Sequence, residues 1–371
     1  MGSPTQGSEI RSMGKKILLK GNEVMCEAAV QAGCRFFAGY PITPQNEVPE
    51  YMSRRMPQVD GVFVQAESEI AAINMVFGAS ASGVRCMTSS SSPGVSLKQE
   101  GISYIAAAEL PCLIANVQRG GPGLGNIRAS QADYFQAVKG GGHGDYRLIV
   151  LAPASLQEIY DLTMKAFDWA DYYRNPVMML GDGISGQMAE PVEIIPYEPI
   201  IDLPAKDFVL DGCKGREPRI VKTLYLRPTD ALVTHNEHLQ EKYKRIENEL
   251  SHCEEYETAD AEIVVAAYGI TARIAKGAVL LARQKGISVG LIRPITLWPF
   301  PKDAFATAAE TVEQILTVEM SHGQFIEDVK LAVNGTCPVE FLGKGGGWYP
   351  TEEIILEKIE SMVAAVAKGG A

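Results

Sequence analysis

Short apolar segments alternate with helical segments through the first half of this chain, and this alternation most constrains its fold. We expect strands at residues 34–38, 61–64, 84–88, 112–118, 148–151 and 177–180. Between them, residues 69–83 predict a helix rich in small side chains. Residues 155–172 predict an amphipathic helix with Ser155 as N-cap and Glu158 completing a capping box. Apolar strands separated by helices form mostly parallel sheets covered on both faces, so the sequence predicts an α/β fold.

The chain divides into regions of different amino-acid composition. Residues 13–195 are rich in glycine and other small residues, and we expect them to form the domain with the parallel sheet. Residues 196–258 are more polar and end in a charged stretch, residues 235–256, that is typical of a solvated linker helix. Residues 1–12 are interpreted as a disordered or added leader outside the fold.

Residues 259–368 return to alternating strands and helices and predict a second, smaller α/β domain. Its strands are expected within residues 261–269, 287–301 and 314–320, and its helices within residues 270–286, 302–309 and 324–333.

The composition excludes several classes of function. The 371 residues carry a formal net charge of −11, which argues against a nucleic-acid-binding face and against a polybasic membrane contact. No apolar run reaches the roughly 18 residues of a membrane span, and the N-terminus lacks a signal peptide's apolar core. The seven cysteines form no CxxC, which excludes a local zinc or iron–sulfur motif and favours reduced thiols in the cytoplasm.

The first candidate site is Gly39-Tyr40-Pro41-Ile42-Thr43-Pro44, directly after a predicted strand. The two prolines restrict the backbone and would hold the Thr43 hydroxyl in one direction. This is the edge of the sheet at which α/β proteins bind ligands. An ordinary strand-to-helix turn is the alternative.

A second candidate is Gln65-Ala66-Glu67-Ser68-Glu69, which opens the small-residue helix. The helix dipole stabilises a carboxylate at this place, whereas a glutamate among the apolar residues that follow is costly without a partner. Glu69 is therefore either a helix-terminal carboxylate or a buried functional acid.

Two polar segments follow later strands. Residues 88–92 are consecutive hydroxyl residues before Pro93-Gly94; they could bind an anion or a polar cofactor ring, or form a polar surface loop. Arg119 ends a strand and precedes a glycine-rich loop, where an arginine can clamp a carboxylate with two parallel hydrogen bonds. His143 could be an acid–base group, although an ordinary loop histidine is the better interpretation.

Gly181-Asp182-Gly183 has the form that starts a magnesium–diphosphate motif. Such a motif needs an asparagine about 30 residues later, yet no asparagine lies between Asn175 and Asn236. We therefore interpret the triplet as a tight turn and predict no metal ligand in this chain.

Together these segments resemble a known family. The motifs GYPITP, QAESEIAAINMVFGA, TSSSSPG, VQRGGPGLG, LIRPITLWPFP and VEMSHGQF are similar, in this order, to those of the 2-oxoacid:ferredoxin oxidoreductases. The resemblance runs from about Lys15 to Val366. It implies a thiamine diphosphate pyrimidine-binding domain followed by a smaller transketolase C-terminal-like domain. The run GGGHGDYRLIVLAPAS is most similar to the branched-chain type, which acts on 2-oxoisovalerate (3-methyl-2-oxobutanoate).

The resemblance implies roles for individual residues. Glu69, rather than Glu67, would hydrogen-bond N1′ of the thiamine aminopyrimidine. Thr43 and Arg119 would hold the 2-oxo acid. The wider cofactor-binding set would be Tyr40, Pro41, Ile42, Thr43, Glu69, Pro93 and Gly94. The reaction would be coenzyme A-dependent oxidative decarboxylation to acyl-CoA and CO2, with reduction of ferredoxin.

The resemblance also implies partner chains. The magnesium and diphosphate site would lie on a diphosphate-binding subunit that shares the cofactor, and the iron–sulfur clusters on a ferredoxin-like subunit, beside a gamma-type subunit. Three alternatives stay open: a 2-oxoglutarate or pyruvate enzyme, a non-catalytic structural subunit of the same complex, and transketolase-like transfer without redox chemistry. A second cation in the pocket, Arg128 or Lys139, would favour 2-oxoglutarate.

Overall fold

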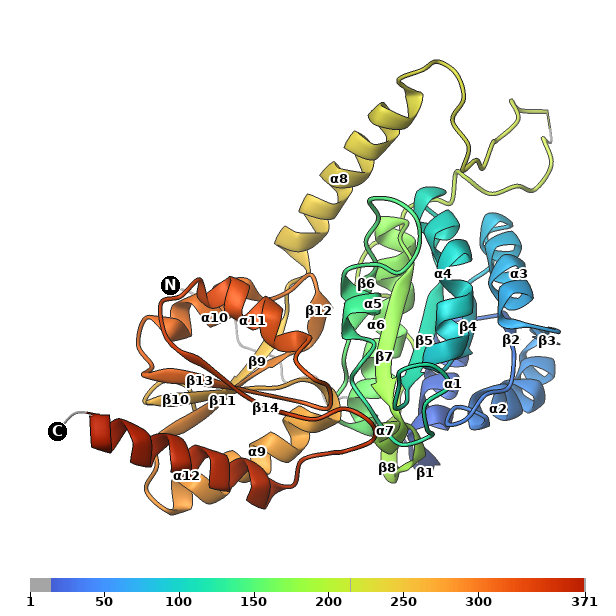
Figure 1. The fold of residues 1–371 in the computed structure, drawn as a ribbon. Coiled ribbons are helices and arrows are strands. Elements are labelled where there is room, and N and C mark those ends of the chain that lie inside the picture. Colours follow the sequence, from blue (N-terminus) through green and yellow to red (C-terminus); the bar gives the residue numbers. More distant parts are fainter. Residues whose placement is uncertain (1–14, 214, 370–371) are drawn as a thin grey trace, which may run out of the picture.

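The computed structural model describes residues 15–213 and 215–369 as two α/β units with a projecting arm (Figure 1). The predicted α/β fold with mostly parallel sheets is confirmed. The leader predicted at residues 1–12 lies outside the described residues.

The larger sheet has the strand order β12-β6-β7-β5-β4-β2-β3, and all of its strands except β12 run parallel. Each strand predicted within residues 13–195 is present, shifted by at most two residues at either end. The strands are β2 (Phe36–Gly39), β3 (Val62–Gln65), β4 (Cys86–Ser90), β5 (Leu113–Gln118), β6 (Ile149–Leu151), β7 (Val177–Asp182) and β12 (Thr296–Trp298).

Helices cover both faces of this sheet (Figure 1). On one face, α3 (Glu69–Ala81) packs against α4 (Ser92–Ala107). On the other, α1 (Gly21–Gln31) packs against α2 (Glu47–Arg55) and α6 (Leu156–Tyr173). Shorter elements complete the unit: β1 (Lys15–Lys20) paired with β8 (Ala189–Ile194), the 3₁₀ helix η1 (Met56–Val59), α5 (Tyr134–Val138) and α7 (Gly183–Gln187).

Two local predictions in this unit need correction. Ser155 is the N-cap of α6, but the Glu158 carboxylate accepts the N–H of Ala154 at 2.8 Å instead of that of Ser155, so the predicted capping box does not form. The surface loop considered for residues 88–92 is also wrong. These residues end β4 and begin α4, because Pro93 in the first turn has a fixed φ that suits a helix start.

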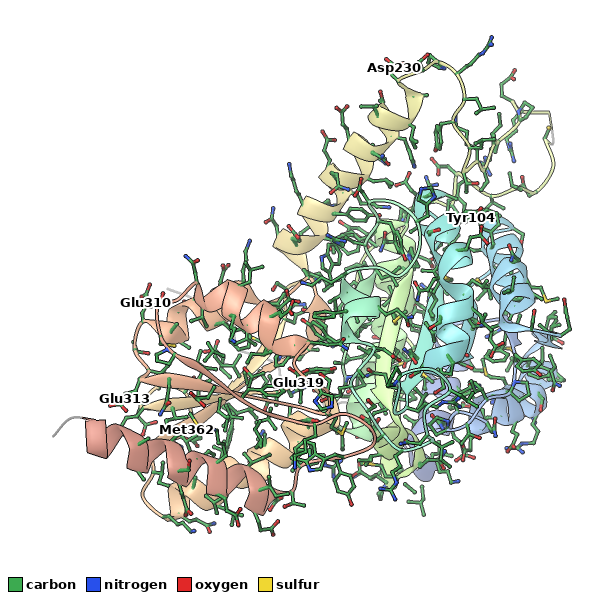
Figure 2. All side chains as sticks on the ribbon, in the orientation of Figure 1. Tyr104, Asp230, Glu310, Glu313, Glu319 and Met362 are labelled. Carbon is green, nitrogen blue, oxygen red and sulfur yellow. The ribbon has the colours of Figure 1, made fainter. Side chains whose placement is uncertain are left out.

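The smaller unit contains a second sheet with the order β14-β13-β10-β11-β9. Its strands are β9 (Cys253–Tyr256), β10 (Ile263–Ala266), β11 (Val289–Pro294), β13 (Gln314–Glu319) and β14 (Val339–Gly343), and its helices are α9 (Gly269–Gln284), α10 (Lys302–Ala309), α11 (Phe325–Val333) and α12 (Glu352–Gly369). Side chains fill the space between its sheet and helices (Figure 2).

The prediction of one helix over residues 235–256 is wrong at both ends. Helix α8 covers Ala231–Glu249, and Asp230 lies at the tip of the arm that precedes it (Figure 2). Residues 253–256 instead form β9, antiparallel to β11, where Glu254 pairs with Arg293 at 2.7 Å. Nor is α8 simply solvated, since its Leu239, Tyr243 and Ile246 are buried.

Strand β12 and the Gln131 side chain are among the contacts that join the units. Strand β12 comes from the third region of the sequence and pairs with β6 at the edge of the larger sheet. The Gln131 side chain donates to the Tyr268 carbonyl at 3.0 Å and accepts from Thr271 Oγ1 at 2.9 Å and from the Met320 N–H at 3.0 Å. The segment that follows the glycine-rich loop is thereby fixed to the smaller unit.

No helix in the described part of the chain is long and apolar enough to cross a membrane.

Candidate active site

The predicted motifs meet at one edge of the larger sheet. Strands β2, β3, β4 and β5 run parallel, so the residues that follow them, from Tyr40, Ala66, Ser91 and Arg119 onward, leave the sheet at the same edge. The direction in which successive strands are added to the sheet changes at β2. Strand β3 lies on one side of β2, and β4 lies on the other. A crevice outside the carboxyl ends at such a reversal is where open α/β sheets bind ligands.

Glu69 is a buried acid at this edge of the sheet. It is the first residue of α3, whose N-cap Ser68 accepts the N–H of Ala71 at 3.2 Å. Only 6 % of Glu69 is exposed, and its carboxylate accepts no hydrogen bond from the residues that the structure describes. A Cβ added to Gly94 would lie 2.5 Å from Glu69 Oε1 and 2.1 Å from Ser90 Oγ, so only glycine fits there. Two predicted residues, Glu69 and Gly94, are therefore in contact.

Two unpartnered hydroxyls lie at the junction of β4 and α4, beside Gly94. The Oγ atoms of Ser90 and Ser91 are buried and have no hydrogen-bond partner among the described residues. The neighbouring Ser89 Oγ donates to Gln45 Oε1 at 2.5 Å, and Gln45 Nε2 donates to the Tyr40 carbonyl at 3.2 Å. A buried polar group without a partner costs about 1–3 kcal/mol, so this cluster is suited to a polar ligand.

Arg119 and Thr43 lie together, and Arg119 contacts the backbone of Thr43. Arg119 Nη1 donates to the Thr43 carbonyl at 2.9 Å, and Nη2 donates to the Leu124 carbonyl at 3.0 Å. Arg119 therefore joins the loop after β2 to the glycine-rich loop, and its buried Nε has no partner in the described structure. The Thr43 hydroxyl accepts from Asn46 Nδ2 at 3.4 Å.

A network that the sequence reasoning missed holds Arg119 in place. The Arg119 N–H donates to Ser92 Oγ at 3.0 Å, and Ser92 Oγ donates to Asp133 Oδ2 at 2.5 Å. Asn116 Nδ2 donates to the same oxygen at 2.9 Å. Burial raises the pKa of Asp133. Asn116 could have indicated this network, because it is a polar residue between apolar residues of β5.

Lys98 was also missed. It lies on α4 with its side chain completely buried, and Nζ donates to Thr88 Oγ1 at 3.0 Å. Burial lowers the pKa of Lys98 to about 8, and the nearby Glu69 carboxylate opposes this shift. The position of Lys98 in the helix could have indicated its burial, because Lys98 shares the inward face of α4 with Val95 and Ile102.

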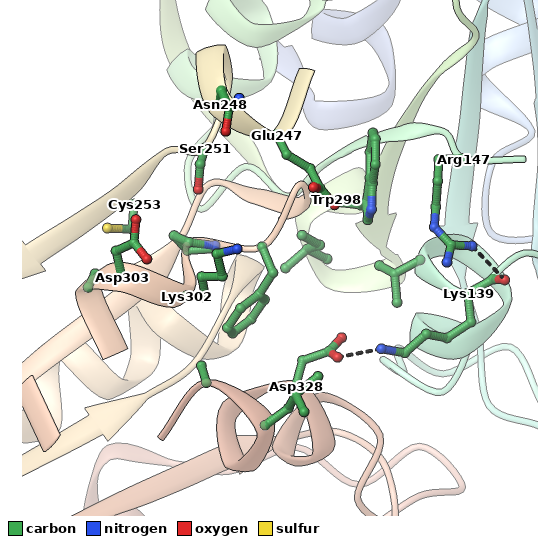
Figure 3. A pocket seen from close by; sticks show the side chains of 17 residues that line it. Lys139, Arg147, Glu247, Asn248, Ser251, Cys253, Trp298, Lys302, Asp303 and Asp328 are labelled. Atoms are coloured by element: carbon green, nitrogen blue, oxygen red, sulfur yellow. Dashed lines mark hydrogen bonds and ion pairs between the residues drawn. The ribbon is translucent and has the colours of Figure 1, made fainter. Parts of the chain in front are cut away.

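A pocket of about 690 Å³ opens beside Thr43, and both units contribute to it. Arg128 and Tyr349 line it, and the Arg128 guanidinium makes no hydrogen bond or ion pair with another described residue. Lys139 lines a different pocket of about 630 Å³, where it pairs with Asp328 (Figure 3). Of the two candidate second cations, therefore, Arg128 alone shares a pocket with Thr43.

Two sequence candidates remain, His143 and the triplet 181–183, of which Gly183 lines the pocket beside Thr43. His143 is in an exposed loop. The triplet joins β7 directly to α7, where a tight turn was predicted. Asp182 is the N-cap of α7, and its Oδ1 accepts the N–H groups of Ile184 at 2.8 Å and Ser185 at 3.0 Å. Burial raises the pKa of Asp182 to about 6.

Comparison with known families gives matches along most of the chain. The family model described as "Pyruvate flavodoxin/ferredoxin oxidoreductase, thiamine diP-bdg" matches residues 27–258. The model described as "Pyruvate:ferredoxin oxidoreductase core domain II" matches residues 261–355.

Curated relatives are similar over nearly their whole length. The chain is 50 % identical to the ketoisovalerate oxidoreductase subunit VorB of Methanothermobacter thermautotrophicus, over 93 % of this chain and 97 % of that protein. It is 39 % identical to the 2-oxoglutarate synthase subunit KorA of the same organism, over 94 % of this chain and 100 % of that protein.

Solved structures share the fold of this chain. The 2-oxoglutarate:ferredoxin oxidoreductase from Magnetococcus marinus, with 2-oxoglutarate, coenzyme A and succinyl-CoA bound, superposes with a TM-score of 0.83 at 25 % identity. The match covers 96 % of this chain and 68 % of that one. A split-gene transketolase, described as an inactive beta4 tetramer, shares the fold with a TM-score of 0.60 at 13 % identity.

Proposed function

Because this chain belongs to the 2-oxoacid:ferredoxin oxidoreductases, we propose that it supplies the catalytic glutamate and the substrate-holding residues of a complex that oxidises a branched-chain 2-oxo acid. The observation that carries the proposal is the buried Glu69 carboxylate, which has no hydrogen-bond donor among the described residues and lies against Gly94. A purely structural subunit would have no reason to bury a carboxylate that lacks a partner.

The residues present fit thiamine diphosphate. The Glu69 carboxylate can hydrogen-bond N1′ of the aminopyrimidine, and the absent Cβ of Gly94 lets this carboxylate lie against the backbone of α4. The free hydroxyls of Ser90 and Ser91 can meet its polar edge. When bound, the cofactor supplies a nucleophilic carbon and an electron sink for decarboxylation.

The chain's own residues would perform the proton and binding steps. Glu69 would hold a proton at N1′, and its burial keeps water from competing for that proton. A general acid–base group of this kind typically contributes about 10²–10⁴-fold to the rate. Arg119 would keep Thr43 in place through its carbonyl and present Nε to the carboxylate of the 2-oxo acid.

The rest of the reaction requires other subunits. We propose that a diphosphate-binding chain with Mg2+ completes the cofactor site, that iron–sulfur clusters on a ferredoxin-like chain take the electrons to ferredoxin, and that a gamma-type chain belongs to the same cytoplasmic complex. Coenzyme A would take up the acyl group. The relatives support such an assembly, since VorB and KorA are themselves named as subunits.

The identities support 2-oxoisovalerate as the substrate, because the ketoisovalerate subunit is 50 % identical and the 2-oxoglutarate subunit 39 %. One observation favours 2-oxoglutarate as a second candidate: the unpaired Arg128 guanidinium lines the pocket beside Thr43 and could bind a second carboxylate.

A reduction assay on the assembled complex separates these candidates. The complex receives thiamine diphosphate, coenzyme A and a low-potential electron acceptor, and kcat/KM is compared for 2-oxoisovalerate, 2-oxoglutarate and pyruvate. We expect 2-oxoisovalerate to exceed pyruvate by about 10–200-fold, the range that apolar pocket contacts provide. Preference for 2-oxoglutarate that is lost in Arg128→Ala would establish the second candidate. Failure to reduce the acceptor with any of the three acids would overturn the proposed function.

A further inference from the structure

Lys98 is a completely buried lysine whose ammonium lies beside the backbone of the proposed catalytic glutamate. Its exposed fraction is 0 %, and its Nζ donates to Thr88 Oγ1 at 3.0 Å and to the Glu69 carbonyl at 3.5 Å. Both acceptors are neutral, and within the described residues no carboxylate lies in ion-pair distance of this ammonium. A buried charge with neutral partners alone is costly.

Packing alone does not account for a lysine at this position. Lys98 lies on the inward face of α4 with Val95 and Ile102, where an unbranched apolar side chain such as methionine would fill a similar volume. Stability therefore favours an apolar residue, and the ammonium must serve another purpose.

Lys98 lies where three elements meet. Helix α4 carries Lys98, α3 begins with Glu69, and β4 contributes the neutral Thr88. The negative charge of Glu69 raises the pKa of Lys98 and so opposes the effect of burial. The hydrogen bond from Nζ to the Glu69 carbonyl also fixes the first residue of α3.

We propose that Lys98 is a positioning residue that holds the Glu69 carboxylate in place and favours it as the acceptor of a hydrogen bond from N1′. This inference rests on the proposed function. An ammonium stabilises a nearby carboxylate and thus shifts the shared proton toward the pyrimidine nitrogen. The effect is present while Lys98 carries its proton and disappears as that proton is lost.

The test compares Lys98→Met, which removes the charge but keeps the length, with Lys98→Arg, which keeps the charge. In the assembled complex, we expect Lys98→Met to bind thiamine diphosphate with about wild-type affinity and to melt no lower than the wild type. Its kcat/KM should fall about 10–100-fold, and the acid limb of its pH profile should move to higher pH. The near-ultraviolet circular dichroism band of the imino tautomer should weaken. Lys98→Arg should recover the band and most of the activity.

Wild-type circular dichroism gives an independent test if Lys98→Met does not assemble. The imino band of the wild-type complex should decrease as the pH rises from 7 to about 9, since the pKa of Lys98 is lowered to about 8. A band that stays constant over this range would contradict the inference, as would Lys98→Met with wild-type rate, band and pH profile. Glu69→Gln separates the two proposals: an active Glu69→Gln complex overturns the proposed function, whereas an inactive one beside a wild-type-like Lys98→Met overturns the role of Lys98 alone.

Discussion

At the scale of single residues, the site depends on the small distance between Gly94 and Glu69. Gly94 is part of the first turn of α4, and its missing side chain lets the carboxylate of α3 lie directly against the backbone. The contact joins two motifs that are 25 positions apart in the sequence.

Gly94→Ala tests this contact. The new Cβ would lie 2.5 Å from Glu69 Oε1, so the carboxylate must move away from N1′. We expect a loss of activity of about 100-fold, the lower end of what acid–base groups contribute, and weaker cofactor binding measured by titration of the assembled complex. Gly78→Ala is the control, since a Cβ there meets nothing within 4 Å and should leave stability equal or about 0.5–1 kcal/mol higher. Full activity in Gly94→Ala would refute the proposed geometry.

The sequence indicated candidate site residues where the residue type was unusual for its place. Glu69 was recognisable because a carboxylate opens a helix of small apolar residues, and Arg119 because it precedes a glycine-rich loop. Lys98 was missed because a lysine in a helix is normally assigned to the solvated face. The hydrogen bond from Arg119 to the Thr43 carbonyl could not be predicted. Every residue has a backbone carbonyl, so the sequence does not indicate which carbonyl accepts.

At the scale of elements, apolar runs in the sequence predicted where most strands lie. The ends of helices and strands were harder to predict, because they depend on contacts with distant parts of the chain. Strands β5 and β7 were predicted closely because both are buried and pair along their length. Strand β9 was mistaken for the end of a helix, since its charged residues Glu254 and Glu255 are typical of a solvated helix. Their pairing partners lie on β11, about 40 positions away, and only the tertiary structure brings them together.

The junction of β7 and α7 gives a prediction that depends on pH. Burial raises the pKa of Asp182 to about 6, above the value of about 3.9 in an unfolded chain, so its ionisation costs stability as the pH rises through this window. Asp182→Asn keeps the N-cap acceptor and removes that cost, which is at most about 3 kcal/mol. We expect a higher melting temperature than wild type at pH 7.5, and a smaller gain at pH 4.

Asp230→Asn, on the exposed tip of the arm, is the matched control and should not change the melting temperature at either pH. Because we interpret Asp182 as a turn residue, Asp182→Asn should retain the magnesium dependence and activity of the assembled complex. Loss of magnesium-dependent cofactor binding in this variant would show instead that the triplet is a metal motif.

At the scale of the whole molecule, the two units form one surface around Thr43. Strand β12 extends the larger sheet, Gln131 binds three groups of the smaller unit, and Tyr349 reaches the pocket beside Thr43. The sequence predicted two α/β units but not this docking. The pairing of β12 with β6 joins residues more than 140 positions apart, and the local patterns of neither segment specify the other.

The proposed function requires Glu69 to be the catalytic glutamate of a 2-oxo acid-oxidising complex. The most direct measurement is the initial rate of ferredoxin reduction with 2-oxoisovalerate by complexes that contain wild-type, Glu69→Gln or Glu67→Gln chains. Glu67 is exposed and lies two positions earlier, so it is a matched control. We expect Glu69→Gln to lose about 10²–10⁴-fold of the rate while the complex remains assembled, and Glu67→Gln to keep it. A Glu69→Gln complex with the wild-type rate would contradict the claim.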